Sequence, residues 1–342
     1  ELDIIIRGEG EQTTLEMVTV WEACHANKLS SDITGSSSFN ANEFYGLLAT
    51  TPGLFLKHPD IRFGGVRQPF TDLSSLPFPY PYLNDPKHQN SSDPLFLDPD
   101  NKIFYYESSR GCPFNCAYCM SSIDKRVRFR ALDKVFADIQ SFMDAQVKLV
   151  KFVDRTFNLK PNRYIAIWKY LYENHNGKTM FHFEIAAEQF TDEALEFLQK
   201  IPVGMMQFEI GIQSTNQKTL QAIHREENWD KLVGIVQRIP NTIQQHLDLI
   251  AGLPYEDLAT FGSSFNDILQ LKPDVLQLGF LKVLLGTEMS EYKDRAKWQW
   301  MSCPPYEILS TPVLSYSDIL ILKDIETLLD VFWNSKNFKT LM

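Results

Sequence analysis

The chain has 342 residues, of which 44% are hydrophobic, 13% aromatic and 22% charged, and its net charge is -10. This composition is typical of a folded globular protein and excludes a wholly disordered chain. The acidic balance disfavours nucleic acid as a partner, because a nucleic-acid surface needs clustered Lys and Arg. No run of about 18 apolar residues is present, so no membrane span is predicted.

The chain opens on a predicted strand at residues 2–6, followed by a Gly-rich turn at residues 7–11 and the start of a helix. No charged-then-apolar signal segment precedes this strand, and the first residue is Glu1 rather than Met. We therefore expect residues 1–25 to be the end of a Rossmann-like domain that begins upstream.

Residues 26–102 are rich in Ser, Asn, Pro and Gly, and residues 76–81 read Leu-Pro-Phe-Pro-Tyr-Pro. Proline at this density excludes a continuous helix or a central strand. We predict a long and mostly irregular connector that packs through its aromatic residues.

From residue 103 onward, apolar runs of strand length alternate with longer segments of helical period. This alternation predicts an α/β fold with parallel strands joined by right-handed crossovers. Six such units are too few for a closed eightfold barrel, so we predict a partial (β/α)6 barrel of the TIM type over residues 103–290. Its reactive site should lie at the C-terminal ends of the strands. The predicted strands are residues 103–108, 149–153, 181–186, 207–212, 246–250 and 276–280, and the predicted helices are residues 132–145, 163–173, 192–200, a broken stretch at 217–238, and 260–271.

Residues 291–342 are predicted to form a small helical extension after the barrel. Residues 318–332 have a helical period, and no strand is predicted after residue 306.

The first predicted strand of the barrel leads into Cys112, Cys116 and Cys119, with the spacing Cys-x3-Cys-x2-Cys. Three thiolates on one loop can hold three corners of an iron–sulfur cubane and leave the fourth iron open. Gly111 permits an unusual backbone angle, and Pro113 stiffens the loop between the ligands. An odd number of cysteines clustered in this way does not suit disulfides, so a reducing cytoplasmic location is expected.

Two other interpretations of these cysteines stay open. A structural zinc site would need Cys24 or Cys303 as its fourth ligand, although zinc modules usually present paired Cys-x2-Cys units and one such pair is present here. In the second interpretation, the cysteines are simply small residues of the core.

The loop from Cys112 to Cys119 resembles the signature of the radical S-adenosylmethionine (SAM) superfamily, including the aromatic Tyr118 before the last cysteine. The resemblance implies a [4Fe–4S] cluster whose open iron binds the amino and carboxylate groups of SAM. It also implies reductive cleavage of SAM to methionine and a 5′-deoxyadenosyl radical, with an electron donor such as flavodoxin or ferredoxin as a partner.

Further candidates for the SAM site follow the later strands. Glu184 lies among apolar neighbours, and its burial is costly unless it meets a partner such as the SAM ammonium or ribose hydroxyls. Gly211 would let a ligand approach the backbone closely. The alternative for Glu184 is a structural ion pair across the barrel. Asp248 is a weaker candidate, as a substrate-side group or a buried acid.

The resemblance also implies roles for residues outside the cysteine loop. Asp154 would lie near the SAM amino group, although an ordinary turn Asp is equally compatible with its place. Gln213 and Ser214 would contact SAM, and Arg225 would bind its carboxylate unless it forms a surface salt bridge instead.

Two segments resemble the cobalamin-dependent branch of the superfamily. Residues 154–157 match its Asp-x-Thr-Phe stretch, and residues 3–11 are similar to the closing strand and turn of a cobalamin-binding domain. The resemblance implies cobalamin in the full-length protein, with the cobalt-ligating His upstream. Residues 304–309 and the helix that follows resemble an uncharacterised domain found after such cores.

The sequence therefore predicts a radical SAM enzyme that starts radical chemistry on an unknown substrate, with cobalamin-dependent methylation as the reaction that the resemblance suggests. One alternative is a methylthiotransferase-like enzyme, which would need further cysteines for a second cluster and a small RNA-binding barrel. The other is a non-catalytic metal-binding or interaction module.

Overall fold

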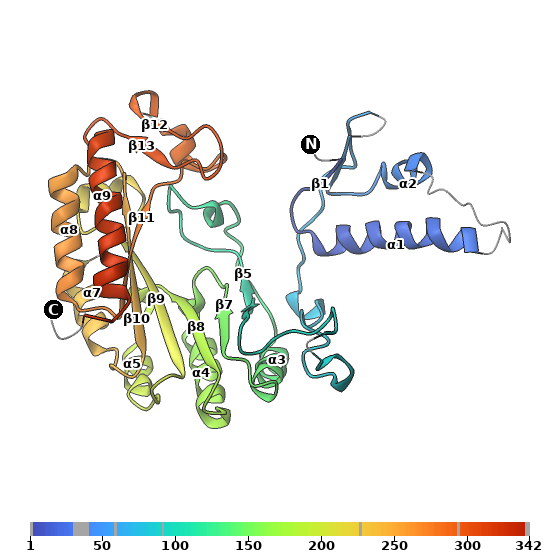
Figure 1. Ribbon diagram of the computed structural model, residues 1–342, viewed down its shortest axis with the longest axis horizontal. Helices are drawn as coiled ribbons and strands as arrows, with labels where there is room; N and C mark the ends of the chain where they lie inside the picture. The colour runs from blue at the N-terminus through green and yellow to red at the C-terminus, as the bar shows by residue number, and fades with distance from the viewer. Residues whose placement is uncertain are drawn as a thin grey trace. The chain divides into compact units, whose positions relative to one another are not determined.

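The computed structural model describes residues 3–29, 41–57, 60–90, 92–225, 228–292 and 295–338 (Figure 1). The chain divides into two compact units, Glu1–Asp72 and Leu73–Met342, each with a hydrophobic core. The boundary between them falls inside the predicted connector, so part of the connector belongs to each unit. None of the described helices combines the length and the apolar character that crossing a membrane requires.

The first unit contains a small antiparallel sheet and two helices. Strands β1 (Ile4–Ile6), β2 (Leu54–Leu56) and β3 (Arg62–Phe63) pair in that order, and the helices are α1 (Glu11–Leu29) and α2 (Ala41–Leu48). The described part of the connector is mostly irregular, as predicted, and also contains α2, β2 and β3. These elements are too short to show a hydrophobic period in the sequence.

The second unit contains a six-stranded parallel sheet, which confirms the predicted partial barrel. The strand order is β11-β10-β9-β8-β7-β4, and the described strands do not close into a barrel. The strands are β4 (Ile103–Tyr106), β7 (Leu149–Phe152), β8 (Met180–Ile185), β9 (Met206–Gln213), β10 (Gln244–Ala251) and β11 (Val275–Phe280).

Helices follow the strands of this sheet in the predicted alternation. Thr191 caps the N-terminus of α5, since its side chain accepts a hydrogen bond from the backbone N–H of Ala194. The predicted broken stretch is two separate helices, each capped by an Asn side chain. The helices are α3 (Leu132–Asp144), α4 (Pro161–Asn174), α5 (Asp192–Leu198), α6 (Gln217–Ala222), α7 (Trp229–Arg238), α8 (Leu258–Gln270) and α9 (Tyr316–Leu329).

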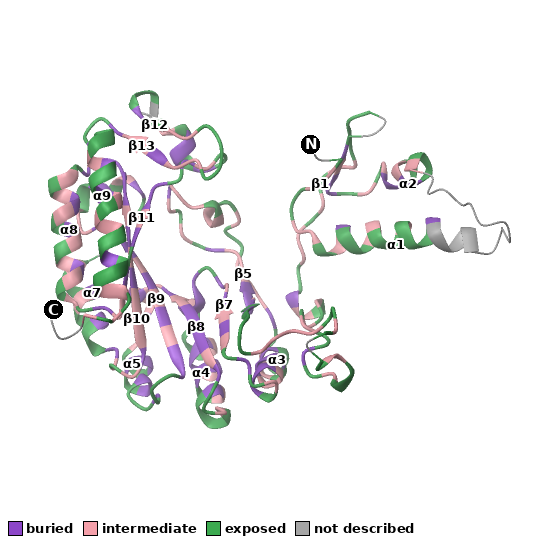
Figure 2. Cartoon of the chain, viewed as in Figure 1, coloured by how far each residue is buried: buried purple, intermediate pink, exposed green. Residues whose placement is uncertain are grey.

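The two faces of the sheet differ in chemistry because alternate residues of a strand point to opposite sides. In β9, Phe208, Ile210 and Ile212 are buried in the main core, where the Phe208 ring stacks on Trp168 of α4. The alternate residues, Glu209 among them, lie on the other face. Figure 2 shows the same contrast in the helices, which are buried on one side and exposed on the other. The sheet therefore has an apolar, helix-covered face and a polar face.

At each edge of the sheet, one side chain forms hydrogen bonds with the backbone N–H and C=O groups of a residue in the edge strand. The Tyr80 hydroxyl accepts a hydrogen bond from the N–H of Tyr105 in β4 and donates one to its carbonyl, both at 2.9 Å. The Asn334 amide makes the equivalent pair with Leu276 of β11, both at 3.0 Å. An edge strand otherwise exposes unpaired N–H and C=O groups, so both contacts protect the sheet.

The C-terminal region contains more than the predicted helix. Strands β12 (Gln299–Trp300) and β13 (Ile308–Ser310) pair antiparallel before α9, which corrects the expectation of no strand after residue 306. Strands of two or three residues carry too little pattern to be predicted. The π-helix η8 (Asp330–Asn334) follows α9, and the 3-10 helices are η1 (Leu73–Ser75), η2 (Pro86–His88), η3 (Met120–Ile123), η4 (Phe157–Leu159), η5 (Ala187–Gln189), η6 (Glu288–Glu291) and η7 (Arg295–Lys297).

Candidate functional site

The cysteine loop follows the first strand of the barrel and is closed at its base by a short ladder. Strands β5 (Ser109–Arg110) and β6 (Arg128–Phe129) pair antiparallel on either side of it. Gly111 has a φ of +98°, and a Cβ at this position would lie 2.3 Å from the carbonyl oxygen of Arg126. Only glycine fits there without strain, as the sequence suggested.

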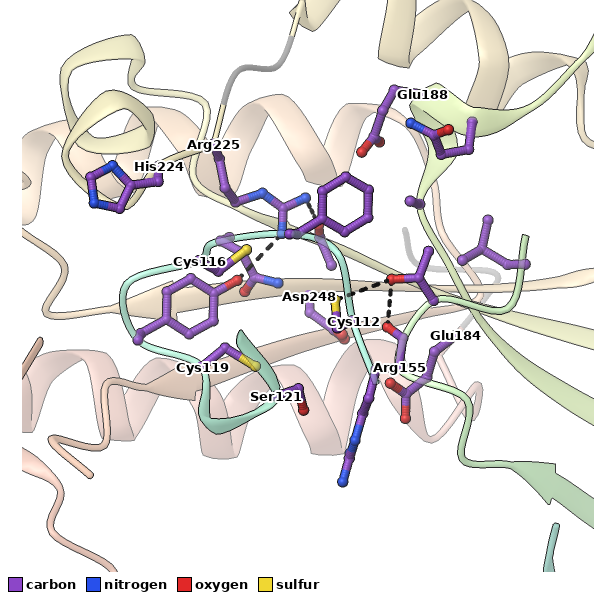
Figure 3. Close-up of a pocket in the computed structure, with 18 of the residues that line it drawn as sticks. Cys112, Cys116, Cys119, Ser121, Arg155, Glu184, Glu188, His224, Arg225 and Asp248 are labelled. Atoms are coloured by element: carbon purple, nitrogen blue, oxygen red, sulfur yellow. Dashed lines mark hydrogen bonds between the residues drawn. The ribbon is translucent and has the colours of Figure 1, made fainter. Parts of the chain in front are cut away.

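The loop faces a cavity of about 670 Å³, which we call the first cavity (Figure 3). Cys112 is buried, and Cys116 and Cys119 are half-buried. Side chains from the ends of β8, β9 and β10 and from the segment after α6 complete the wall. The structure thus brings together all the predicted site residues except two, with the lining formed in part by Cys112, Cys116, Tyr118, Cys119, Glu184, Gly211, Gln213 and Arg225.

The three cysteines fit an iron–sulfur cubane better than a single ion. No three His, Cys, Asp or Glu side chains in the described part of the chain are grouped so that they could hold one metal ion. A zinc site needs such a group. A cubane does not, because each cysteine binds a different iron of the cluster. The zinc interpretation with Cys303 therefore has no support in the described residues of the second unit.

Arg225 connects the cysteine loop to strand β9. Its Nη2 donates a hydrogen bond to the carbonyl oxygen of Gly211 at 2.8 Å, and its Nη1 lies 3.3 Å from the Tyr118 hydroxyl oxygen. Burial raises the pKa of the Cys116 thiol, whereas the Arg225 guanidinium lowers it. Arg225 thus supplies a positive charge beside the thiols, where it favours the metal-binding thiolate form.

Two buried polar atoms on the cavity wall lack hydrogen-bond partners among the described residues: Oε1 of Gln213 and Oδ1 of Asp248. Gln213 has a φ of 71°, and its Nε2 lies close over Gly211, where a Cβ would approach it to 2.2 Å. Buried polar atoms are rarely left unsatisfied, so both atoms point to a ligand with polar groups.

The floor of the first cavity is acidic. Burial would raise the pKa of Glu209, but hydrogen bonds from His182 at 2.8 Å and Lys151 at 2.9 Å outweigh it and lower this pKa to about 2. Burial raises the pKa of Glu184 and of Asp248, and the neighbouring Glu209 carboxylate raises both further. A cationic ligand would relieve this like-charge repulsion.

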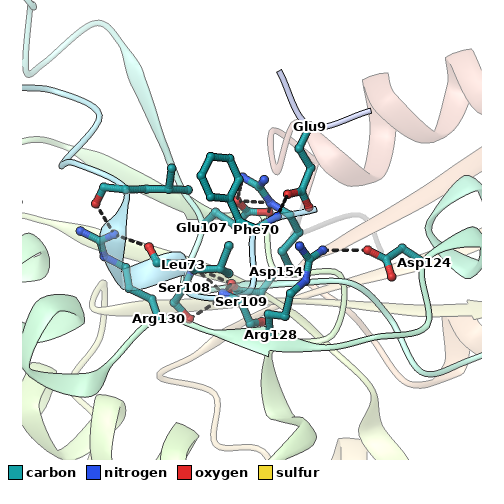
Figure 4. Close-up of polar contacts among 12 residues, drawn as sticks. Glu9, Phe70, Leu73, Glu107, Ser108, Ser109, Asp124, Arg128, Arg130 and Asp154 are labelled. Carbon is teal, nitrogen blue, oxygen red and sulfur yellow. Dashed lines mark hydrogen bonds and ion pairs between the residues drawn. The ribbon is translucent and has the colours of Figure 1, made fainter. Parts of the chain in front are cut away.

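Asp154 is a predicted site residue that does not line the cavity. Its fully buried carboxylate accepts hydrogen bonds from the N–H and hydroxyl of Ser108 and the N–H of Ser109, at 2.6 to 3.2 Å (Figure 4). Burial raises its pKa to about 7, against the effect of these bonds. Asp154 thus positions the chain that enters the cysteine loop, which is the turn-type role that the sequence left open.

Ser214 is also absent from the cavity lining. It is fully buried, and its hydroxyl donates to Oε1 of Glu256 at 2.6 Å; the Ser264 hydroxyl donates to the same oxygen at 3.0 Å. Burial raises the pKa of Glu256 to about 7, although these two bonds lower it. These hydrogen bonds support the end of β9 on the side away from the first cavity.

Several polar residues of the inner face were missed in the sequence. Lys151, His182, Glu209 and His246 lie on the polar face of β7 to β10, and Glu209 is opposite both Glu184 and His246 in the strand pairing. The alternation of polar and apolar residues within each strand could have identified them. In the sequence analysis, this alternation was used only for the acids Glu184 and Asp248.

Comparison with protein families gives two matches. Residues 106–268 match the radical SAM superfamily, and residues 296–342 match a family described as a protein of unknown function, DUF4080. The first match contains the cysteine loop and most of the first cavity.

An uncharacterized methyltransferase of Pyrococcus horikoshii is 27% identical over 170 residues, which cover 48% of this chain and 31% of that protein. The chain also shares its fold with TsrM from Kitasatospora setae, a radical SAM methyltransferase solved with its tryptophan substrate and a SAM analogue. The TM-score between this chain and TsrM is 0.62, and the match has 15% sequence identity and covers 92% of this chain and 58% of TsrM. OxsB, a cobalamin-dependent radical SAM enzyme, gives a TM-score of 0.53, with 14% identity over 95% of this chain and 45% of the other.

Proposed function

We propose that the chain, whose residues 106–268 match the radical SAM superfamily, is the catalytic part of an enzyme that reductively cleaves SAM. The first cavity carries this proposal. It brings the three cysteines of one loop against a guanidinium, an acidic floor and two unsatisfied polar atoms from other strands. No single segment of the sequence contains this set.

Cys112, Cys116 and Cys119 would hold the [4Fe–4S] cluster, with Arg225 favouring their thiolate forms. When bound, the cluster would supply the electron that breaks SAM into methionine and a 5′-deoxyadenosyl radical. Gly111 keeps the loop backbone in the shape that turns the thiols into the cavity.

The remaining lining residues suit the groups of SAM. Arg225 can bind the carboxylate, and Glu184 can accept from the ammonium. Oε1 of Gln213 and Oδ1 of Asp248 can accept hydrogen bonds from hydroxyl groups, which would satisfy both atoms. The volume of about 670 Å³ is in the usual range for ligand pockets.

Cobalamin-dependent methylation is the reaction that we favour. Two observations support it. TsrM and OxsB share their fold with nearly all of this chain, and the relative from Pyrococcus horikoshii is named a methyltransferase. The first unit, with its strand β1, would then be the end of the cobalamin-binding domain. The chain spans less than two thirds of each of these proteins, so this proposal concerns the full-length protein.

Anaerobic reconstitution with iron and sulfide tests the proposal. We expect a cluster whose visible absorption and electron paramagnetic resonance change on adding SAM, and release of 5′-deoxyadenosine on reduction. Replacing Cys116 by Ala should abolish both, whereas replacing the exposed Cys303 should change neither. A protein that binds zinc and shows no response to SAM would contradict the proposal.

The methylation is tested on the full-length protein, reconstituted in the same way. SAM labelled in its methyl group, with cobalamin added to the full-length protein, should yield labelled methylcobalamin. Deoxyadenosine release without methyl transfer would leave the radical SAM assignment in place and remove the methyltransferase part.

A further inference from the structure

The segment that follows β7 carries three buried polar side chains, those of Asp154, Thr156 and Asn158. It contains the Asp-x-Thr-Phe stretch of residues 154–157. Asp154 binds the chain that enters the cysteine loop. Burying a polar group is costly unless it has partners, so the contacts of the other two side chains indicate what this segment does.

Asn158 fixes the end of this segment against the end of β8. Its Nδ2 donates a hydrogen bond to the carbonyl oxygen of Ala186 at 2.8 Å, and its Oδ1 accepts one from the N–H of Ala186 at 2.9 Å. Ala186 directly follows β8 and lines the first cavity. Because Asp154 is bound as well, the backbone is held on both sides of Thr156.

The Thr156 side chain contacts the cysteine loop instead of capping its own helix. Thr156 is the N-cap residue of η4, where a Thr hydroxyl ordinarily accepts a hydrogen bond from a backbone N–H of the helix, but its side chain makes no such bond. Its Oγ1 lies 3.9 Å from Sγ of Cys112, at the long end for a hydrogen bond to sulfur, and donates to the carbonyl oxygen of Arg155 at 2.8 Å (Figure 3). Thr156 and Cys112 are both buried, and both line the first cavity.

The direction of this contact depends on the state of Cys112. In the free thiol, either the thiol or the hydroxyl can be the donor. A sulfur that binds iron is a thiolate without a proton, so only the Thr156 hydroxyl can then donate. The hydroxyl hydrogen rotates about the Cβ–Oγ1 bond without moving any heavy atom, so it can turn from the Arg155 carbonyl to the sulfur. A negatively charged acceptor forms the stronger hydrogen bond, which favours this turn.

We propose that Thr156 donates a hydrogen bond to the Cys112 sulfur when the cluster is bound and thereby raises the reduction potential of the cluster. The proposal rests on the proposed function, because it concerns the cluster that the cysteines would hold. Reduction adds one electron from the external donor, and part of the added negative charge resides on the cysteine sulfurs. A hydrogen bond to one of these sulfurs stabilises the reduced form more than the oxidised form, and such bonds help to set the potential of an iron–sulfur cluster.

The test is a redox titration of the reconstituted full chain, without SAM, followed by electron paramagnetic resonance. Thr156→Val keeps nearly the shape of Thr but lacks the hydroxyl. We expect it to lower the equilibrium constant for reduction about tenfold, which corresponds to a shift of ~59 mV to more negative potential for one electron. Thr156→Ala should shift the potential in the same direction, and Thr156→Ser should stay close to the wild type. The matched control is Thr179→Val, because Thr179 is also buried but precedes β8, at the opposite end of the sheet.

Three results would overturn the proposal. The first is a wild-type potential in Thr156→Val and Thr156→Ala, and the second is a Thr156→Ser potential shifted as far as theirs. The third is a cluster that forms in neither apolar variant, because the hydroxyl would then serve assembly and not the potential; iron content per chain detects this.

Deoxyadenosine release by the wild type separates this proposal from the proposed function. If the wild type releases it while the potential does not depend on the hydroxyl, only the role of Thr156 fails. If the potential shifts as expected while no deoxyadenosine is released, the role of Thr156 stands and the SAM chemistry fails.

Discussion

Two carboxylic acids, Asp154 and Glu256, hold segments that form the wall of the first cavity, although neither side chain lines it. Both are buried, and both have a pKa raised by burial to about 7. They differ in what they hold: Asp154 binds the chain before the cysteine loop, and Glu256 binds Ser214 at the end of β9. Each can be tested separately.

Replacing Asp154 with Ala should lower the iron content of the reconstituted protein. The N–H groups of Ser108 and Ser109 would lose their acceptor in a buried place, at a cost of about 1–3 kcal/mol each. Iron per chain and the unfolding midpoint in denaturant are the measurements. Asp133→Ala, at an exposed position, is the control. A full iron content in Asp154→Ala would show that the loop forms without this support.

Replacing Glu256 with Gln should change stability in a pH-dependent way. A carboxyl whose folded pKa is raised from 4.5 to about 7 destabilises the folded state as the pH rises through this interval. The penalty is absent below about pH 4.5 and complete above about pH 7, where it reaches roughly 3 kcal/mol. Gln avoids it and can still accept from Ser214. The variant should therefore unfold at higher temperature than the wild type at pH 8 and show no such gain at pH 4.5; an equal effect at both values would refute the interpretation.

At the scale of elements, the fold depends on how the edges of the parallel sheet are finished. Helix α9 and η8 lie along β11, and the Asn334 amide replaces the missing neighbour of Leu276.

Asn334→Ala should destabilise the protein by about 1–3 kcal/mol, because the N–H and C=O of Leu276 would lose their partner. Urea unfolding measures the loss, and hydrogen exchange at the Leu276 amide should become faster than in the wild type. The exposed Asn337 provides a matched control. Unchanged exchange at Leu276 would mean that the helix holds this edge by other contacts.

At the scale of the whole molecule, the first cavity belongs to the second unit. Its lining residues lie between Cys112 and Asp248, and among the described residues the main core draws only on the second unit. A unit with its own core and its own site can fold by itself.

A fragment of residues 70–342 should therefore unfold in one cooperative transition and bind the cluster. Its circular dichroism, its iron content and its deoxyadenosine release are the measurements, with the full chain as reference. An aggregated fragment, or one without iron, would show that the second unit needs the first.

The sequence by itself determined the barrel, the cysteine loop and Gly111. These features are local or periodic: strands and helices alternate, three cysteines share one loop, and one glycine occupies a left-handed position. The cofactor assignment also came from the loop, through its resemblance to a known signature, and the family comparison agrees.

Only the tertiary structure decided which side chains meet. Asp154 and Ser214 follow the ends of β7 and β9, close to Glu184 and Gln213 in the last residues of β8 and β9. The side chains of Asp154 and Ser214 nevertheless point behind the wall instead of into the first cavity. Strands β2 and β3 and the C-terminal strands β12 and β13 form pairings too short to show a period. Helix α9 packs against β11 although the two are far apart in the chain, and no local pattern records a contact at that separation.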